Sequence, residues 1–339
     1  MSFTDIIGND SAKIRLQAAL QHGHLAHALL LAGPEGVGKK RVALELAKRL
    51  NCQKPVSAEP CDACSSCRRI PQNLHPDVQV IAPTESVYIR IEQARYLRTE
   101  AYFRPLEGRR RVFIIDEADR MNKEAANAIL KTLEEPPETT VIILITASPQ
   151  ALLPTIRSRC QLLPFSPLPL ASISAWLQAQ GKYAKATDAE LTARLSLGSI
   201  GRALDIDLPA YKELRNEAFL AAENVVILKS FVEINKSALA SGKDRKAFEA
   251  YLSVLLLLLR DTLVFKHLNT MDLVVNCDMR DALKRLAGKA PFELLSAFID
   301  RLNQVRSALD RNINRQMALE ALLLDLCNPF NLSRLKELA

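Results

Sequence analysis

Short apolar runs alternate with helical patterns along the first 165 residues of the chain. The apolar runs are residues 27–31, 78–82, 112–115, 141–145 and 162–165, and each has the length of a buried strand. The helical patterns between them are residues 41–50, 89–102 and 125–133. This alternation predicts an α/β domain in which helices cover both faces of a parallel sheet, with a ligand at the carboxyl ends of the strands.

Prolines interrupt the alternation near residue 166. The stretch PFSPLPL contains Pro164, Pro167 and Pro169, and we interpret it as a linker. We therefore predict an α/β domain at residues 1–166, a small helical domain at 167–207 and an all-α domain at 208–339.

Apolar residues recur at steps of three and four in two segments of the helical region. They are Leu295, Phe298, Leu302, Val305 and Leu309, and then Leu319, Leu322, Leu323 and Leu326. This spacing places them on one face of a helix. The face packs either in the core of its own domain or against another subunit, and the pattern leaves both alternatives open.

The composition is that of an ordinary globular protein. Of 339 residues, 48% are hydrophobic and 24% are charged, and the net charge of +7 permits a polyanionic partner without requiring one. The first residues lack the pattern of a secretory signal, and the longest apolar run, residues 254–259, is too short to span a bilayer. We expect a cytoplasmic protein with no membrane partner, whose 7 cysteines are reduced thiols or metal ligands.

A phosphate-binding loop, GPEGVGKK, follows the first apolar run. Gly33, Gly36 and Gly38 let backbone N–H groups turn toward a phosphate, and Lys39 supplies a cation to its oxygens. The next position normally carries a hydroxyl that binds Mg²⁺, but Lys40 has no lone pair and adds positive charge. We expect a loop built for ATP, with poor Mg²⁺ binding and weak hydrolysis; whether ATP is retained stays open.

Four of the 7 cysteines lie close together in the sequence, at Cys52, Cys61, Cys64 and Cys67. Their C-x8-C-x2-C-x2-C spacing lets four thiolates converge on one tetrahedral ion, so we predict a structural Zn²⁺ site in an insertion at about residues 52–67. An iron–sulfur cluster and a redox-active pair are the alternatives. His75 is close in sequence, but four sulfurs already complete the site.

Polar residues follow two of the predicted strands. Asp116 stands at the tip of one, where its carboxylate can reach Mg²⁺, and Glu117 beside it can polarise an attacking water. Thr146 follows the next strand, where a hydroxyl can sense the γ-phosphate of a nucleotide.

Several arginines are further candidates. Arg159, within Ser-Arg-Cys, and Arg202, within GSIGR, each offer a planar guanidinium that suits a transferring phosphoryl group, although either also fits a surface position. A basic cluster can face DNA phosphates or be an ordinary solvated surface, and it consists of Arg104, Arg109, Arg110 and Arg111.

The order of these motifs is similar to that in bacterial clamp-loader AAA+ subunits. The phosphate-binding loop is followed by the cysteines, the acidic strand VFIIDEAD, the stretch NAILKTLEEPP at residues 127–137, and Ser-Arg-Cys. The stretch NAILKTLEEPP is highly specific to that family. Residues 312–326 are similar to the closing helix of the family's oligomerising collar, so the resemblance covers all three predicted regions.

The resemblance implies an architecture and a role. It implies an AAA+ domain with a zinc-bearing insertion, a helical lid and a helical collar. In this family, gamma/tau, delta and delta-prime subunits form a pentamer that opens a sliding clamp and closes it around primer-template DNA. Because the chain is short, lacks a long C-terminal extension and carries Lys40, we expect a partner of the gamma/tau and delta subunits rather than the motor itself.

The resemblance also assigns roles by position. Lys39 is the P-loop lysine, Asp116 and Glu117 are the acidic pair, and Thr146 and Arg202 are the sensor-one and sensor-two residues. Arg159 is a finger inserted into the ATP site of a neighbouring subunit. The segment with Phe3, Ile6 and Ile7 packs around the adenine in this family.

Three alternatives remain at this point. The chain can be an ATP-hydrolysing gamma/tau-type motor, a zinc-dependent nucleic-acid-binding protein with a vestigial P-loop, or a small P-loop kinase. The kinase is disfavoured because no convincing phosphoacceptor pocket follows the loop.

Overall fold

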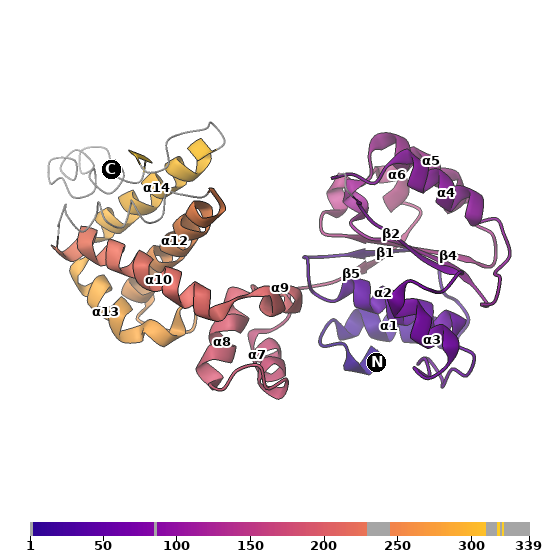
Figure 1. Cartoon of the computed structure of the whole chain (residues 1–339), viewed down its shortest axis with the longest axis horizontal. Coiled ribbons are helices and arrows are strands. Elements are labelled where there is room, and N and C mark those ends of the chain that lie inside the picture. The colour runs from indigo at the N-terminus through magenta and orange to yellow at the C-terminus, as the bar shows by residue number, and fades with distance from the viewer. Residues whose placement is uncertain (1–2, 85–86, 229–244, 310–316, 319–320, 322–339) are drawn as a thin grey trace. The chain divides into compact units, whose positions relative to one another are not determined.

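The computed structural model of the protein describes residues 3–84, 87–228, 245–309, 317–318 and 321. The chain forms two compact units, which are drawn in Figure 1. The first consists of Met1–Ala179 with Ser196–Asp205, and the second of Gln180–Leu195 with Ile206–Ala339. No helix in these described ranges is both long and apolar enough to cross a membrane.

A parallel sheet of five strands forms the centre of the first unit. The strands are β1 (Ala28–Ala32), β2 (Val78–Ile81), β3 (Arg111–Ile115), β4 (Thr140–Thr146) and β5 (Gln161–Pro164). They lie in the order β2-β3-β4-β1-β5, and every neighbouring pair is parallel. All five predicted strands are therefore confirmed, each to within one residue at either end.

Helices cover both faces of this sheet. In Figure 1, α1 (Asp10–Gln21), α2 (Lys39–Asn51) and α3 (Ser65–Arg69) lie on one side, and α4 (Ile91–Glu100), α5 (Lys123–Glu134) and α6 (Pro154–Arg157) lie on the other. Successive side chains of a strand point to opposite faces. β1 accordingly sends Leu29 and Leu31 into the core shared with α1 and α2, and Leu30 into the core shared with α4, α5 and α6.

The direction of the strands sets where the candidate residues lie. Gly33 follows β1, Asp116 follows β3 and Thr146 ends β4, so all three are at the carboxyl edge of the sheet. Arg159 precedes β5, whose first residue, Gln161, lies opposite Leu29 of β1. Arg159 is therefore at the amino edge, which is the opposite end of the same sheet.

The second unit is helical in its described part. It contains α8 (Ala186–Leu195), α10 (Leu208–Glu223), α12 (Arg245–Leu268), α13 (Arg280–Lys289) and α14 (Phe292–Ala308). Leu295, Phe298 and Leu302 of α14 are fully buried among residues of α12 and α13. The first predicted apolar face thus lies in the core of its own unit.

The predicted lid at residues 167–207 contributes helices to both units. α7 (Leu170–Ala179) and α9 (Ile200–Asp205) belong to the first unit, and α8 belongs to the second. The division into three domains stays a prediction. The second apolar face, at Leu319, Leu322, Leu323 and Leu326, lies outside the described residues, as does most of the segment 312–326.

Candidate functional site

A cavity of about 630 Å³ opens beside the phosphate-binding loop at the carboxyl edge of the sheet. Its lining brings together the predicted residues Gly36, Gly38, Lys39, Lys40, Asp116, Glu117 and Thr146. Glu35, Asp119 and Arg120 line it as well. The strand order explains this convergence, because β3, β4 and β1 are consecutive neighbours and all end at this edge.

Two glycines shape the loop. Gly38 has φ +98° and directly precedes α2, so the first N–H groups of that helix face the loop, as in an anion-binding site. Gly36 has φ +71°, and a Cβ there would lie 2.2 Å from Ser199 Oγ. The Gly36 carbonyl also accepts a hydrogen bond of 3.0 Å from the N–H of Gly201, in the first turn of α9. The loop is therefore held between the sheet and the segment that carries Arg202.

The Lys39 ammonium is folded back onto its own loop. It donates to the carbonyl oxygens of Gly33 and Pro34, and its side chain is buried. Burial lowers the pKa of Lys39, while the nearby carboxylates, Asp116 first among them, oppose that shift. A phosphate entering the loop would have to replace these two carbonyls as the partner of the ammonium.

Lys40 forms an ion pair with the acidic residue at the strand tip. Its Nζ lies 3.0 Å from Asp116 Oδ2, and the two side chains are 53% and 17% exposed. The ammonium is thus paired with the carboxylate that would otherwise bind a Mg²⁺ ion. A pair this exposed contributes only about 0–1 kcal/mol to stability, but a divalent ion must displace it before it can bind Asp116.

Glu117 and Thr146 line the cavity but are engaged with other residues. Glu117 has a left-handed backbone with φ +52°, and its carboxylate lies 2.7 Å from Arg120 Nε. Thr146 Oγ1 donates to Asp119 Oδ1 at 2.5 Å and accepts from the N–H of Ser148 at 2.9 Å. Asp119 was absent from the sequence candidates, although it lies in the same acidic run as Asp116.

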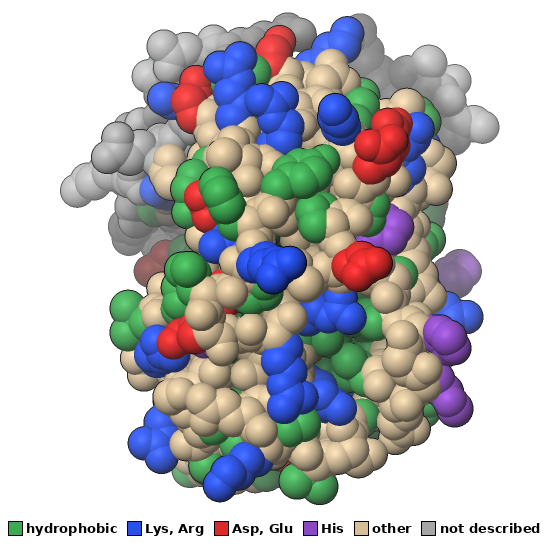
Figure 2. Space-filling view, turned by 90° about the vertical axis from the view of Figure 1, so that its right-hand side faces the viewer, with side chains coloured by type: hydrophobic (Ala, Val, Ile, Leu, Met, Phe, Trp, Pro, Cys, Tyr) green, Lys and Arg blue, Asp and Glu red, His purple; other side chains and the backbone are tan. Residues whose placement is uncertain are grey.

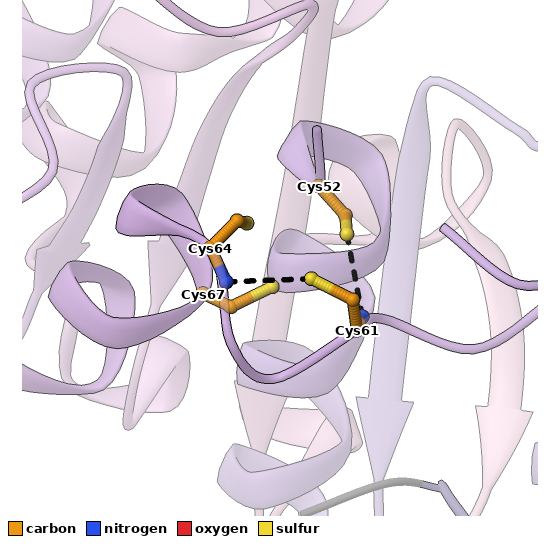
Figure 3. A group of neighbouring side chains, drawn as sticks. All are labelled: Cys52, Cys61, Cys64 and Cys67. Atoms are coloured by element: carbon orange, nitrogen blue, oxygen red, sulfur yellow. Dashed lines mark hydrogen bonds between the residues drawn. The ribbon is translucent and has the colours of Figure 1, made fainter. Parts of the chain in front are cut away.

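The four cysteines converge beside the carboxyl end of α2, as Figure 3 shows. All four Sγ atoms lie within 4.8 Å of one another. This fits a tetrahedral ion with metal–sulfur bonds of 2.3 Å, for which the sulfurs would be about 3.8 Å apart. Hydrogen bonds from the N–H groups of Ala63 and Cys64 lower the pKa of Cys61 to about 6, which favours the thiolate that a metal requires.

A buried ion cluster attaches the cysteine loop to the phosphate-binding helix. Lys48 of α2 is 3% exposed, and its Nζ lies 2.8 Å from Glu45 Oε2 and also contacts Asp62 Oδ1. Asp62 directly follows Cys61 and has φ +56°. Cys52 directly follows the last residue of α2 as its C-cap, so this helix begins at the P-loop and leads to the first thiol.

Neither of the two candidate arginines lines the cavity. Arg159 is at the amino edge of the sheet, where its Nη2 lies 2.6 Å from Glu134 Oε1. Arg202 is exposed on α9 and does not line the cavity, although its neighbour Gly201 contacts the loop. The structure therefore does not bring Arg159 together with the P-loop of its own chain.

Other residues singled out in the sequence do not line the cavity. Phe3 and Ile6 are buried in the core of the first unit, and Ile7 is half-buried. His75 is buried, accepts a hydrogen bond at Nδ1 from the N–H of Asp77, and is not among the grouped sulfurs. Within the basic cluster Arg111 is buried against Glu100, so it is not a surface residue.

A P-loop after β1, with a carboxylate after β3 in a five-stranded parallel sheet, is the arrangement of the P-loop fold class. Models of the family "DNA polymerase III, delta subunit" and of its C-terminal region match residues 8–169 and 227–327. The chain is 32% identical to DNA polymerase III subunit delta' of Bacillus subtilis, over 91% of this chain and 93% of that protein. It is 35% identical to the delta' subunit of Pseudomonas aeruginosa, over 88% and 90%.

Gamma/tau subunits match a smaller part of the chain. DNA polymerase III subunit gamma/tau of Mycobacterium tuberculosis is 38% identical over 52% of this chain. The matched part spans only 30% of the length of that relative. The chain belongs to the delta' family of DNA polymerase III clamp-loader subunits. The resemblance inferred from the motifs is thus confirmed, and the gamma/tau alternative is not favoured.

Replacing Lys40 tests the account of the loop. We expect Lys40→Thr to free Asp116 and supply a hydroxyl, so that Mg²⁺ strengthens the binding of an ATP analogue by about tenfold, or ~1.4 kcal/mol. In the unmutated chain, Mg²⁺ should change that binding little. Calorimetric titration with and without Mg²⁺ measures both, and Lys40→Met is the control that removes the charge without adding a ligand. A strong Mg²⁺-stimulated ATPase in the unmutated, isolated chain would contradict the account.

Proposed function

We propose that this chain works in an assembly with gamma/tau-type and delta-type subunits that loads a sliding clamp onto primer-template DNA. Its membership of the delta' family supports this proposal. Within the assembly it is mainly a scaffold, and it delivers the Arg159 guanidinium to the ATP site of a neighbouring subunit.

The position of Arg159 carries the second part of the proposal. β1 and β5 are paired and parallel, with Gln161 opposite Leu29, so Arg159 lies at the amino edge and the P-loop at the carboxyl edge. Strands of four or five residues separate these edges by roughly 13–17 Å. A guanidinium at that edge is poorly placed for its own P-loop and well placed for a nucleotide on another subunit.

The chain's own nucleotide site is proposed to hydrolyse ATP weakly or not at all. Lys39 is bound to the Gly33 and Pro34 carbonyls, and Lys40 is paired with Asp116. Mg²⁺ normally bridges phosphate oxygens and neutralises their developing charge. An ammonium at Asp116 cannot bridge in this way, so any ATP bound here is expected to be held rather than turned over.

The four cysteines are proposed to hold a structural Zn²⁺ ion. Their sulfurs fit a closed tetrahedral site made of Cys52, Cys61, Cys64 and Cys67, which leaves no position for a substrate. The ion would cross-link the loop, while Lys48 attaches that loop to α2 through Asp62.

The proposal includes DNA as a partner of the whole assembly. Figure 2 shows that on one face the Lys and Arg side chains are spread among acidic and hydrophobic ones rather than joined in one stripe. On this face, that distribution suits contacts made jointly with other subunits better than a separate DNA-binding track.

Metal analysis tests the zinc site. The purified chain should contain about one Zn²⁺ per molecule, and Cys64→Ser with Cys67→Ser should remove it. The loop at residues 52–67 should then become sensitive to protease. The sheet should stay folded, because neither hydrophobic core of the first unit includes a residue of this loop. Elemental analysis, limited proteolysis and circular dichroism measure these outcomes. An iron-dependent visible absorbance, or no bound zinc, would overturn the assignment.

Replacing Arg159 tests the proposed function. Arg159→Ala should leave the complex assembled but silence the one site that the arginine completes, which is worth on the order of 10³-fold at that site. Arg159→Lys should restore little, because a single ammonium does not reproduce the planar fork. The measurement is the clamp- and DNA-stimulated ATPase and the loading rate of reconstituted complexes, with size checked by gel filtration.

The matched control is Arg157→Ala, which removes an exposed arginine two residues away. We expect this variant to behave as the unmutated complex. Equal rates in the unmutated and Arg159→Ala complexes would show that the chain contributes scaffold alone.

A further inference from the structure

The Arg159 guanidinium makes two hydrogen bonds and one ion pair at the amino edge of the sheet. Its Nη1 donates to the carbonyl of Thr155 at 2.9 Å and approaches Ser158 Oγ at 3.4 Å. Its Nη2 lies 2.6 Å from Glu134 Oε1. Thr155 and Ser158 come from the segment of Arg159 itself, so Glu134 is the partner contributed by a different element.

These contacts leave part of the guanidinium available. The group has five N–H donors. The two on Nη1 are directed to Thr155 and Ser158, and the Glu134 carboxylate lies beside Nη2 as an ion pair, so among the described contacts the Nε donor and at least one Nη2 donor remain. A pair of N–H groups is what bidentate recognition of a phosphate requires.

Glu134 is itself firmly placed. It is the last residue of α5, and the preceding residue, Leu133, is buried and has its carbonyl hydrogen-bonded to His27 Nε2 at 3.1 Å. A cation beside the end of this helix is also favoured by the helix dipole. The backbone of Arg159 is also held, because its backbone N–H donates to the carbonyl of Ile156, a fully buried residue.

We propose that Glu134 is a positioning residue for Arg159. It holds one edge of the guanidinium so that the remaining donors point out from the sheet toward a neighbour's γ-phosphate. This inference rests on the proposed function, in which Arg159 acts on another subunit. Glu134 touches neither nucleotide nor the reacting atoms, and it acts only through the arginine.

The exposure of the pair sets the size of the expected effect. The Arg159 and Glu134 side chains are 35% and 46% exposed, so the pair contributes little to stability and its loss should not unfold the chain. Misplacing a catalytic group lowers the rate at its site, and for one lost contact we expect a loss of about three- to tenfold.

The experiment compares variants in the reconstituted complex with gamma-type and delta partners. The difference in ATPase rate between the unmutated and the Arg159→Ala complexes gives the share of the total rate that comes from the one site that this chain completes. Glu134→Ala should lose about two thirds to nine tenths of that share, which corresponds to a site slowed by about three- to tenfold. The KM for ATP should stay unchanged, because the nucleotide is bound by the neighbour.

Conservative and control variants separate positioning from a structural role. Glu134→Gln should retain more of the rate than Glu134→Ala, because an amide oxygen of the same length keeps a polar contact with Nη2 although the charge is lost. Glu135→Ala is the matched control on the next residue, which is also exposed, and it should have no effect. If Glu134→Ala fails to assemble, Glu134→Lys serves as the second variant, and repulsion of the guanidinium should remove the whole share.

Each outcome is distinct. Unchanged ATPase in Arg159→Ala would overturn the proposed function and this inference with it. A loss in Arg159→Ala with normal or raised rates in Glu134→Ala would overturn the inference alone. In the double variant, rates equal to those of Arg159→Ala support the inference, and a further loss would show that Glu134 acts elsewhere.

Discussion

Parallel pairing of β1 with its neighbours β4 and β5 is the constraint on which the other features depend. All strands start at one edge of the sheet and end at the other, so the P-loop, Asp116 and Thr146 meet at the carboxyl edge. The same pairing puts Arg159 at the amino edge. One subunit therefore carries a P-loop at one end of the sheet and Arg159 at the other, an arrangement that suits the proposed row of subunits.

The charges at the carboxyl edge explain why this subunit is proposed to supply an arginine to a neighbour rather than to hydrolyse ATP itself. A lysine replaces the usual hydroxyl, and its ammonium lies 3.0 Å from Asp116. The pair satisfies the carboxylate without a metal, while Lys39 is satisfied by loop carbonyls. The loop can thus keep its P-loop shape with its charges internally compensated, and the shape still matters because Gly36 contacts the segment of α9.

The sheet could be predicted from the sequence because its strands are continuous apolar runs that no competing pattern obscures. Helix α2 was harder: the apolar pattern of residues 41–50 predicts the helix, yet Glu45 and Lys48 are buried while Leu44 and Leu50 are only half-buried. Glu45 and Lys48 can be buried because Asp62, from the cysteine loop, also pairs with Lys48. Nothing in the sequence around Asp62 indicates that it pairs with a residue of α2. The pairing of Glu134 with Arg159 was missed for the same reason, since 25 positions separate the two residues and only the fold brings them together.

The most direct test of the central claim is an electron cryomicroscopy structure of the assembled complex with an ATP analogue and Mg²⁺. The account predicts that the Arg159 guanidinium of this chain lies within hydrogen-bonding distance of the γ-phosphate bound to the adjacent subunit, and that Asp116 of this chain is paired with Lys40 rather than with Mg²⁺. An Arg159 side chain that faces solvent in the assembled complex, with a Mg²⁺–nucleotide coordinated at Asp116 instead, would contradict it.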